Sequence, residues 1–199
     1  MGAGILLISI HNGRLFFLFG KENKYADTPG YADFGGGVDE GEELLETAIR
    51  EFTEETTGFW GSAEDLKRYI NTVGSLYIDL PSTGNSRNPV AYRTYIVPVK
   101  YSPTFEQFYN NNHAFLEEKL PVEVYRDLKI FEKSKVVWAT IGDIKAAVSD
   151  APQKKKQSSE LTFRPYYVPV VKKLIDNHDK IFHFVSHSVK YSGNNLFTS

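Results

Sequence analysis

The apolar and polar residues of the chain form two kinds of pattern, and the first kind predicts β-strands. The run from Gly4 to Ile10 is apolar and rich in β-branched residues, and a second apolar run follows from Arg14 to Gly20. Because His11-Asn12-Gly13 is a turn sequence, these two runs predict a β-hairpin. Two further strands are predicted at Val73 to Leu80 and at Val90 to Val99, on either side of a turn-rich loop.

The second pattern has a helical period and begins after the three glycines at 35–37. Apolar residues recur at positions i, i+3, i+4 and i+7, namely Leu45, Ala48, Ile49 and Phe52. This spacing predicts a helix with one buried face, and Gly58 is a suitable end for it.

The second half of the chain predicts mainly helices. Helical spacing covers Thr104 to Lys119, Val122 to Phe131, Ile141 to Val148 and Tyr166 to Phe184, with a short strand at Lys135 to Ala139 and a polar loop at Gln153 to Glu160. The polar tail from about residue 186 is expected to be flexible.

Length and composition indicate one domain over residues 1–199. No apolar run approaches the eighteen or so residues that a membrane helix needs, and no signal peptide is evident, so we expect a cytoplasmic protein without a membrane partner. The chain has no cysteine, which excludes disulfides, thiol catalysis and thiolate-bound zinc. Any metal ion must therefore be held by oxygen or histidine. Oligomeric state is left open.

Negative charge is concentrated in one segment. Eight of the seventeen positions from Asp39 to Glu55 are acidic and only Arg50 is basic, whereas the rest of the chain holds 17 acids and 22 bases. On a helical wheel Glu51, Glu54 and Glu55 share an arc about 100° wide beside the buried face. Like charges at this spacing destabilise a helix. A divalent ion would offset the repulsion, and oxygen ligands favour Mg²⁺ or Mn²⁺; a solvated acidic face is the alternative interpretation.

These residues, together with the preceding glycines, resemble the signature of the Nudix hydrolase superfamily. The matching positions are Gly36, Glu42, Arg50, Glu51, Phe52, Glu54 and Glu55. One departure follows them, because Thr56 and Thr57 precede Gly58 where the family has a single residue. The resemblance implies an α/β/α sandwich, with a mixed sheet between helices and with residues 104–131 as a helical insertion, either a lid or a side helix.

The resemblance also implies roles for the motif residues. Glu51, Glu54, Glu55 and the backbone carbonyl of Gly36 would bind the metal ions, and Arg50 would orient the glutamates. The family hydrolyses phosphoanhydride bonds, commonly in a nucleoside diphosphate linked to another group. Its members differ in their general base. Glu132 lies where some members place this base, and an ordinary surface acid is an equally weighted interpretation. Glu117 and Glu118 are the competing candidates.

The substrate is less defined by the sequence. Arg93, Lys154 and Arg164 could contact phosphates, although isolated bases are more often solvated. A dinucleoside polyphosphate or a nucleotide sugar is the first expectation, and a diphosphoinositol polyphosphate or capped RNA is the alternative, so RNA is a second possible partner. A different class of function is a Nudix-like module that binds a nucleotide or RNA without cleaving it.

Overall fold

One mixed β-sheet of seven strands lies at the centre of the computed structural model, which describes residues 1–82, 89–149 and 161–191. The strands are β1 (Gly2–His11), β2 (Arg14–Glu22), β3 (Tyr31–Ala32), β4 (Phe34–Gly37), β5 (Leu76–Pro81), β6 (Val90–Pro98) and β7 (Lys133–Thr140). Strand β1 pairs antiparallel with β2 and β4 and parallel with β6. Strands β3 and β7 pair with β2, and β5 pairs with β6.

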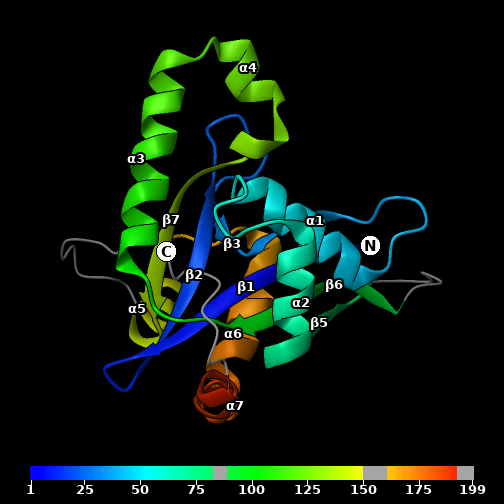
Figure 1. Ribbon diagram of the computed structural model, residues 1–199, viewed down its shortest axis with the longest axis vertical. Coiled ribbons are helices and arrows are strands. Elements are labelled where there is room, and N and C mark those ends of the chain that lie inside the picture. The colour runs from blue at the N-terminus through cyan, green and yellow to red at the C-terminus, as the bar shows by residue number, and fades with distance from the viewer. Residues whose placement is uncertain (83–88, 150–160, 192–199) are drawn as a thin grey trace.

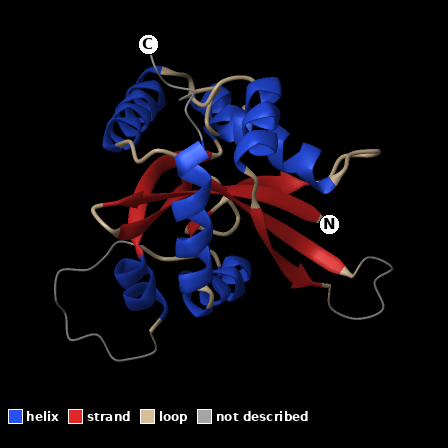
Figure 2. Ribbon diagram, turned by 60° about the horizontal axis from the view of Figure 1, so that its bottom comes forward, coloured by secondary structure: helices blue, strands red, loops and turns tan. Residues whose placement is uncertain are grey.

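Helices cover both faces of this sheet (Figure 2). They are α1 (Leu44–Glu55), α2 (Ala63–Val73), α3 (Pro103–Lys119), α4 (Val122–Asp127), η1 (Lys129–Phe131), α5 (Ile141–Val148), η2 (Pro165–Tyr167), α6 (Val168–Asp176) and α7 (His178–Tyr191). Side chains of α1, α2 and α3 share one hydrophobic cluster, and those of α5, α6 and α7 share the other. Strand β1 contributes alternately to the two, which explains its unbroken apolar run. The predicted α/β/α sandwich is confirmed.

Two predicted elements agree closely with the structure. The hairpin of β1 and β2 turns at Asn12 and Gly13, whose φ values of 49° and 70° are those of the tight turn that such a hairpin requires. Helix α1 begins after Glu43, which forms a reciprocal capping box with Glu46. Its predicted apolar stripe is buried, and it packs on β1 and β4.

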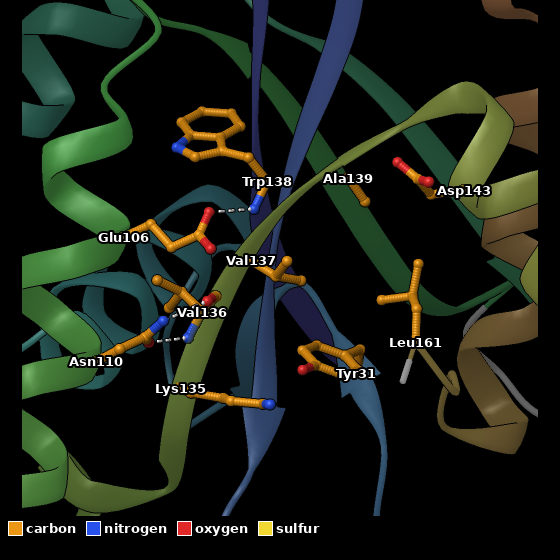
Figure 3. Close-up of a pocket in the computed structure, with 10 residues that line it drawn as sticks. All are labelled: Tyr31, Glu106, Asn110, Lys135, Val136, Val137, Trp138, Ala139, Asp143 and Leu161. Atoms are coloured by element: carbon orange, nitrogen blue, oxygen red, sulfur yellow. Dashed lines mark hydrogen bonds between the residues drawn. The ribbon is translucent and has the colours of Figure 1, made fainter. Parts of the chain in front are cut away.

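The helical insertion consists of α3, α4 and η1, and it extends beyond the sheet at the top of Figure 1. Helix α3 lies along β7, where the Asn110 side chain donates to the carbonyl of Val136 at 3.0 Å and accepts from its N–H at 2.7 Å. The Glu106 carboxylate accepts from the Trp138 N–H at 2.9 Å (Figure 3). These side chains occupy backbone groups that an added strand would otherwise use.

Helix α2 is an element that the sequence pattern did not predict. It begins at a capping box between Ser62 and Asp65 and ends at Val73, which was expected to begin a strand. Strand β5 therefore starts only at Leu76. The prediction was wrong because Val73 belongs to the buried face of α2, whereas the strand pattern begins after Gly74.

The C-terminal region also differs from the predicted single helix. The segment Tyr166 to Phe184 is divided into η2, α6 and α7, with the break at Asn177, whose side chain donates to the Lys173 carbonyl at 2.9 Å. Helix α7 continues to Tyr191, so the start of the tail at about residue 186 was placed too early. The expected loop at Gln153 to Glu160 lies outside the described residues. No described helix has both the length and the apolar character needed to cross a bilayer.

Candidate metal and active site

The glycine strand β4 brings the backbone of Gly36 against helix α1. A Cβ atom at Gly36 would lie 2.5 Å from the carboxyl carbon of Glu51, closer than real atoms approach. Only glycine leaves room for this carboxylate beside the strand. Gly36 and Glu51, which are fifteen positions apart in the sequence, therefore adjoin in the fold.

Arg50 joins the acidic residues on either side of this contact. Its guanidinium holds Glu42 through two hydrogen bonds of 2.8 and 3.0 Å, and its Nη1 donates to Glu51 at 2.7 Å. Its Nη2 also donates to the carbonyl oxygen of Gly37 at 3.0 Å. The hydrogen bonds from Arg50 lower the pKa of the Glu42 carboxyl to about 2. The arginine thus fixes the orientation of the Glu51 carboxylate.

Glu55 is fully enclosed by protein. One of its oxygens accepts from the Gly35 N–H at 2.8 Å, and the other lies 3.1 Å from the Nζ atom of Lys133. Lys133 also pairs with Glu22, whose carboxylate contacts Arg164 at 2.8 Å. Burial raises the pKa of Glu55, and the Lys133 ammonium opposes that rise. Four charged side chains of alternating sign therefore lie in a row from α1 to the residue before η2, namely Glu55, Lys133, Glu22 and Arg164.

Glu54 and Glu132 have fewer contacts. The Oε2 atom of Glu54 is buried without a hydrogen bond, at 3.7 Å from Nη1 of Arg50. Glu132 follows η1 and is half-buried, and burial together with the nearby Glu51 charge raises its pKa. Both carboxylates therefore have capacity for a further ligand.

The residues present suit a hard divalent cation. The donors are carboxylate and carbonyl oxygens, and the buried Oε2 of Glu54 has no hydrogen-bond partner. Among the described residues, however, no three acids already converge on a single point. Arg50 and Lys133 hold two of the glutamates in ion pairs instead. A divalent cation at such a site would bind through a few carboxylates and complete its shell with water.

The three candidate substrate residues are in different places. Arg164 lies at the site through its contact with Glu22. Arg93 is bound by two hydrogen bonds, of 2.6 and 2.7 Å, to Asp79 and lies 4.0 Å from the ring centre of Tyr77. Its guanidinium is occupied by these contacts. Lys154 lies outside the described residues.

Lys133 and Glu22 are site residues that the sequence did not indicate. Strand alternation would place Lys133 on the same face as Lys135, in a polar run typical of a surface. A register irregularity opposite Glu22 leaves Ser134 as an extra residue and turns Lys133 toward α1. Sequence periodicity contains no signal for such a bulge.

A separate pocket of about 280 Å³ lies beside β7 (Figure 3). It is bordered by Glu106 and Asn110 of α3 and by Leu161 across the strand. None of the acidic motif residues lines it, so it is distinct from the site described above.

A family model described as the NUDIX domain matches residues 1–155. The chain belongs to the Nudix family. Among solved structures, the Nudix hydrolase RenU from M. smegmatis has a TM-score of 0.53 and 14% identity, over 90% of this chain and 86% of that one. At such identity the likeness concerns the fold alone.

Two other solved structures have lower TM-scores. A C. elegans Ap4A hydrolase binary complex has a TM-score of 0.49 and 13% identity, covering 94% of this chain and 99% of that chain. The NUDIX domain of Shewanella oneidensis NrtR complexed with ADP ribose has a TM-score of 0.44 and 12% identity, covering 89% and 86%. The chain has no significant match among curated protein sequences.

The extra threonine in the Nudix motif has a structural explanation. Thr56 ends α1, and Thr57 follows in the left-handed conformation with a φ of 51°. The Thr57 N–H bonds to the Glu54 carbonyl at 2.9 Å, and the Gly58 N–H bonds to the Thr53 carbonyl at 3.0 Å. This is a Schellman motif, in which glycine is the usual left-handed residue. Here the inserted threonine takes that position, and the face bearing the glutamates is unchanged.

Proposed function

We propose that this chain is a divalent-metal-dependent hydrolase that cleaves a phosphoanhydride bond in a nucleoside diphosphate linked to another group. The observation that carries the proposal is the junction of Gly36, Glu51 and Arg50, which gathers the acidic motif at one end of the sheet. Membership of the Nudix family supports the reaction type. A dinucleoside polyphosphate or a nucleotide sugar is the expected substrate.

Glu51, Glu54, Glu55 and the Gly36 carbonyl would hold Mg²⁺ or Mn²⁺. Bound ions of this kind screen the phosphate charge and stabilise the leaving phosphate. Arg50 has a positioning role, because it keeps the Glu51 carboxylate turned toward Gly36. The unpartnered Oε2 of Glu54 supports its assignment as a ligand.

Glu132 is the proposed general base. Its carboxylate would accept one proton from the attacking water as the water oxygen bonds to phosphorus. The anhydride P–O bond then breaks, and its oxygen leaves with the departing phosphate. The raised pKa of Glu132, caused first by burial, favours this role because a base is most effective when its pKa is nearer the working pH.

Arg164 is the proposed contact for the substrate phosphates. Its Nη1 is held by Glu22, while its buried Nε has no hydrogen-bond partner. The guanidinium also lies 5.0 Å from the ring centre of Tyr166. An arginine with donor capacity beside an acidic metal site suits a phosphorylated ligand.

The test is metal-dependent phosphate release from a panel of phosphoanhydrides. The panel holds a dinucleoside polyphosphate, a nucleotide sugar, a diphosphoinositol polyphosphate and capped RNA, each with Mg²⁺, with Mn²⁺ and with a chelator. Glu54→Gln should abolish turnover of any substrate that the wild-type chain cleaves. Glu40→Gln is the matched control, because Glu40 is an exposed acid of the same segment. An unchanged rate in Glu54→Gln would remove the assignment, and binding without cleavage would favour a non-catalytic module.

A further inference from the structure

Lys133 is a charged side chain in a place where charge is costly. It is 1% exposed, and its stem lies over Gly20, where a Cβ would lie 3.0 Å from the lysine chain and 3.0 Å from the Phe34 ring. Its ammonium pairs with both Glu22 and Glu55. Replacing a buried ion pair by apolar residues is often neutral or stabilising. Stability alone therefore does not account for a lysine at this position.

The position of the ammonium relates it to the proposed metal site. It lies 3.1 Å from Oε1 of Glu55, and the other oxygen of that carboxylate accepts from Gly35. The ammonium thus takes coordination capacity that a metal ion would use. Its charge also opposes the approach of any cation to Glu55.

Neighbouring charges keep the ammonium in place. Burial lowers the pKa of Lys133, but the carboxylates of Glu55 and Glu22 raise it by more, so the net direction is upward. On the far side, Arg164 binds Glu22 at 2.8 Å. The two cations, Lys133 and Arg164, alternate with the two anions, Glu55 and Glu22, so these four side chains together have no net charge.

We propose that the Lys133 ammonium is a resident cation of the metal site, which acts through Glu55 to weaken the binding of divalent ions. The inference rests on the proposed function, since it concerns the same glutamates. Lys133 is a positioning residue and does not itself touch the reacting atoms. By weakening this binding, Lys133 allows divalent ions at the site to exchange with solvent.

The test measures Mn²⁺ binding to the free protein by calorimetry or electron paramagnetic resonance. Lys133→Met removes one positive charge and should tighten Mn²⁺ binding on the order of tenfold or more, since a unit charge a few ångströms from a divalent ion has at least this effect. Glu22→Gln removes one negative charge from the same group and should weaken binding to a similar extent. The double variant Glu22→Gln/Lys133→Met should return toward the wild-type affinity.

Opposite changes in Mn²⁺ affinity in the two single variants distinguish an effect of charge from structural damage. A purely structural role of these residues would weaken binding in both variants. A folded Lys133→Met that binds Mn²⁺ as the wild type does, or more weakly, would overturn the proposal. If Lys133→Met fails to fold, the other two variants still test the proposal. It requires that Glu22→Gln weakens Mn²⁺ binding and that the double variant recovers it. A wild-type chain that binds no Mn²⁺ would instead overturn the proposed function.

Discussion

The hydroxyl of Tyr109 donates a 2.7 Å hydrogen bond to the backbone carbonyl of Glu55. Tyr109 lies on α3 and is fully buried, and its hydroxyl is also 3.2 Å from the Lys133 carbonyl. The insertion therefore contacts both the end of α1, which bears Glu55, and the start of β7, which bears Lys133. Of the two expectations for residues 104–131, these contacts favour a side helix that supports the site over a lid.

Removing this hydroxyl should destabilise the chain. We expect Tyr109→Phe to lower the free energy of unfolding by about 1–3 kcal/mol, because the Glu55 carbonyl loses a partner in a buried position. Urea denaturation measures the change. Tyr77→Phe is the control, since Tyr77 is 58% exposed. Equal stability of the two variants would show that the contact contributes nothing.

Thr57 offers a stabilising substitution. Its left-handed backbone costs a residue with a Cβ about 1 kcal/mol, which glycine avoids. Thr57→Gly should therefore raise the free energy of unfolding by about 0.5–1 kcal/mol. Thr57→Ala is the matched control, because it removes the hydroxyl bond to the Thr56 carbonyl without relieving the backbone. A gain in the alanine variant but not in the glycine variant would contradict this explanation.

Asn110 should protect the edge of β7. Asn110→Ala leaves the N–H and carbonyl of Val136 without their side-chain partner, so we expect a loss of about 1–3 kcal/mol and faster aggregation on heating. Asn111→Ala, at the exposed neighbouring position, should match the wild type. Thermal unfolding followed by light scattering measures both effects. Identical aggregation of the two variants would exclude a protective role.

Asp33 should make stability depend on pH. Burial raises its pKa from 3.8 to about 6, although the hydroxyls of Thr94 and Tyr92 donate to it. A carboxyl with a raised pKa favours the folded state when protonated, so this contribution is complete below pH 3.8 and is lost as pH rises through about 6. The loss amounts to about 3 kcal/mol.

Asp33→Asn cannot ionise and should lack that decline. The difference in unfolding free energy between wild type and variant, measured by urea titration at pH values from 4 to 7 (about one unit apart), should shift in favour of the variant as pH rises. A constant difference across this range would contradict the buried, protonated state of Asp33.

The sequence predicts the elements whose signals are local. The hairpin turn at Asn12-Gly13 and the apolar stripe of α1 need no tertiary information. Helix α2 was also predictable in principle, because Ser62 and Asp65 form a capping box and the buried residues Leu66, Ile70 and Val73 follow at helical spacing.

Other features depend on tertiary contacts and could not be predicted. Lys133 turns inward only because of the bulge opposite Glu22, and a run of polar residues does not reveal a bulge. The fold places Glu51 and Glu55 beside the glycine strand, whereas the family motif contains nothing about the lysine that pairs with Glu55. Arg93 and Arg164 looked equivalent in the sequence, and only the fold separates them.

In the proposed reaction water attacks phosphorus, and a divalent ion is required. The most direct measurement is hydrolysis of the phosphoanhydride panel in ¹⁸O-labelled water by the wild-type chain, with mass spectrometry of the products. We predict that one ¹⁸O atom enters a phosphoryl product of at least one substrate when Mg²⁺ or Mn²⁺ is present, and that a chelator prevents it. Absence of labelled product from every substrate, or labelling that persists with the chelator, would exclude this metal-dependent attack by water.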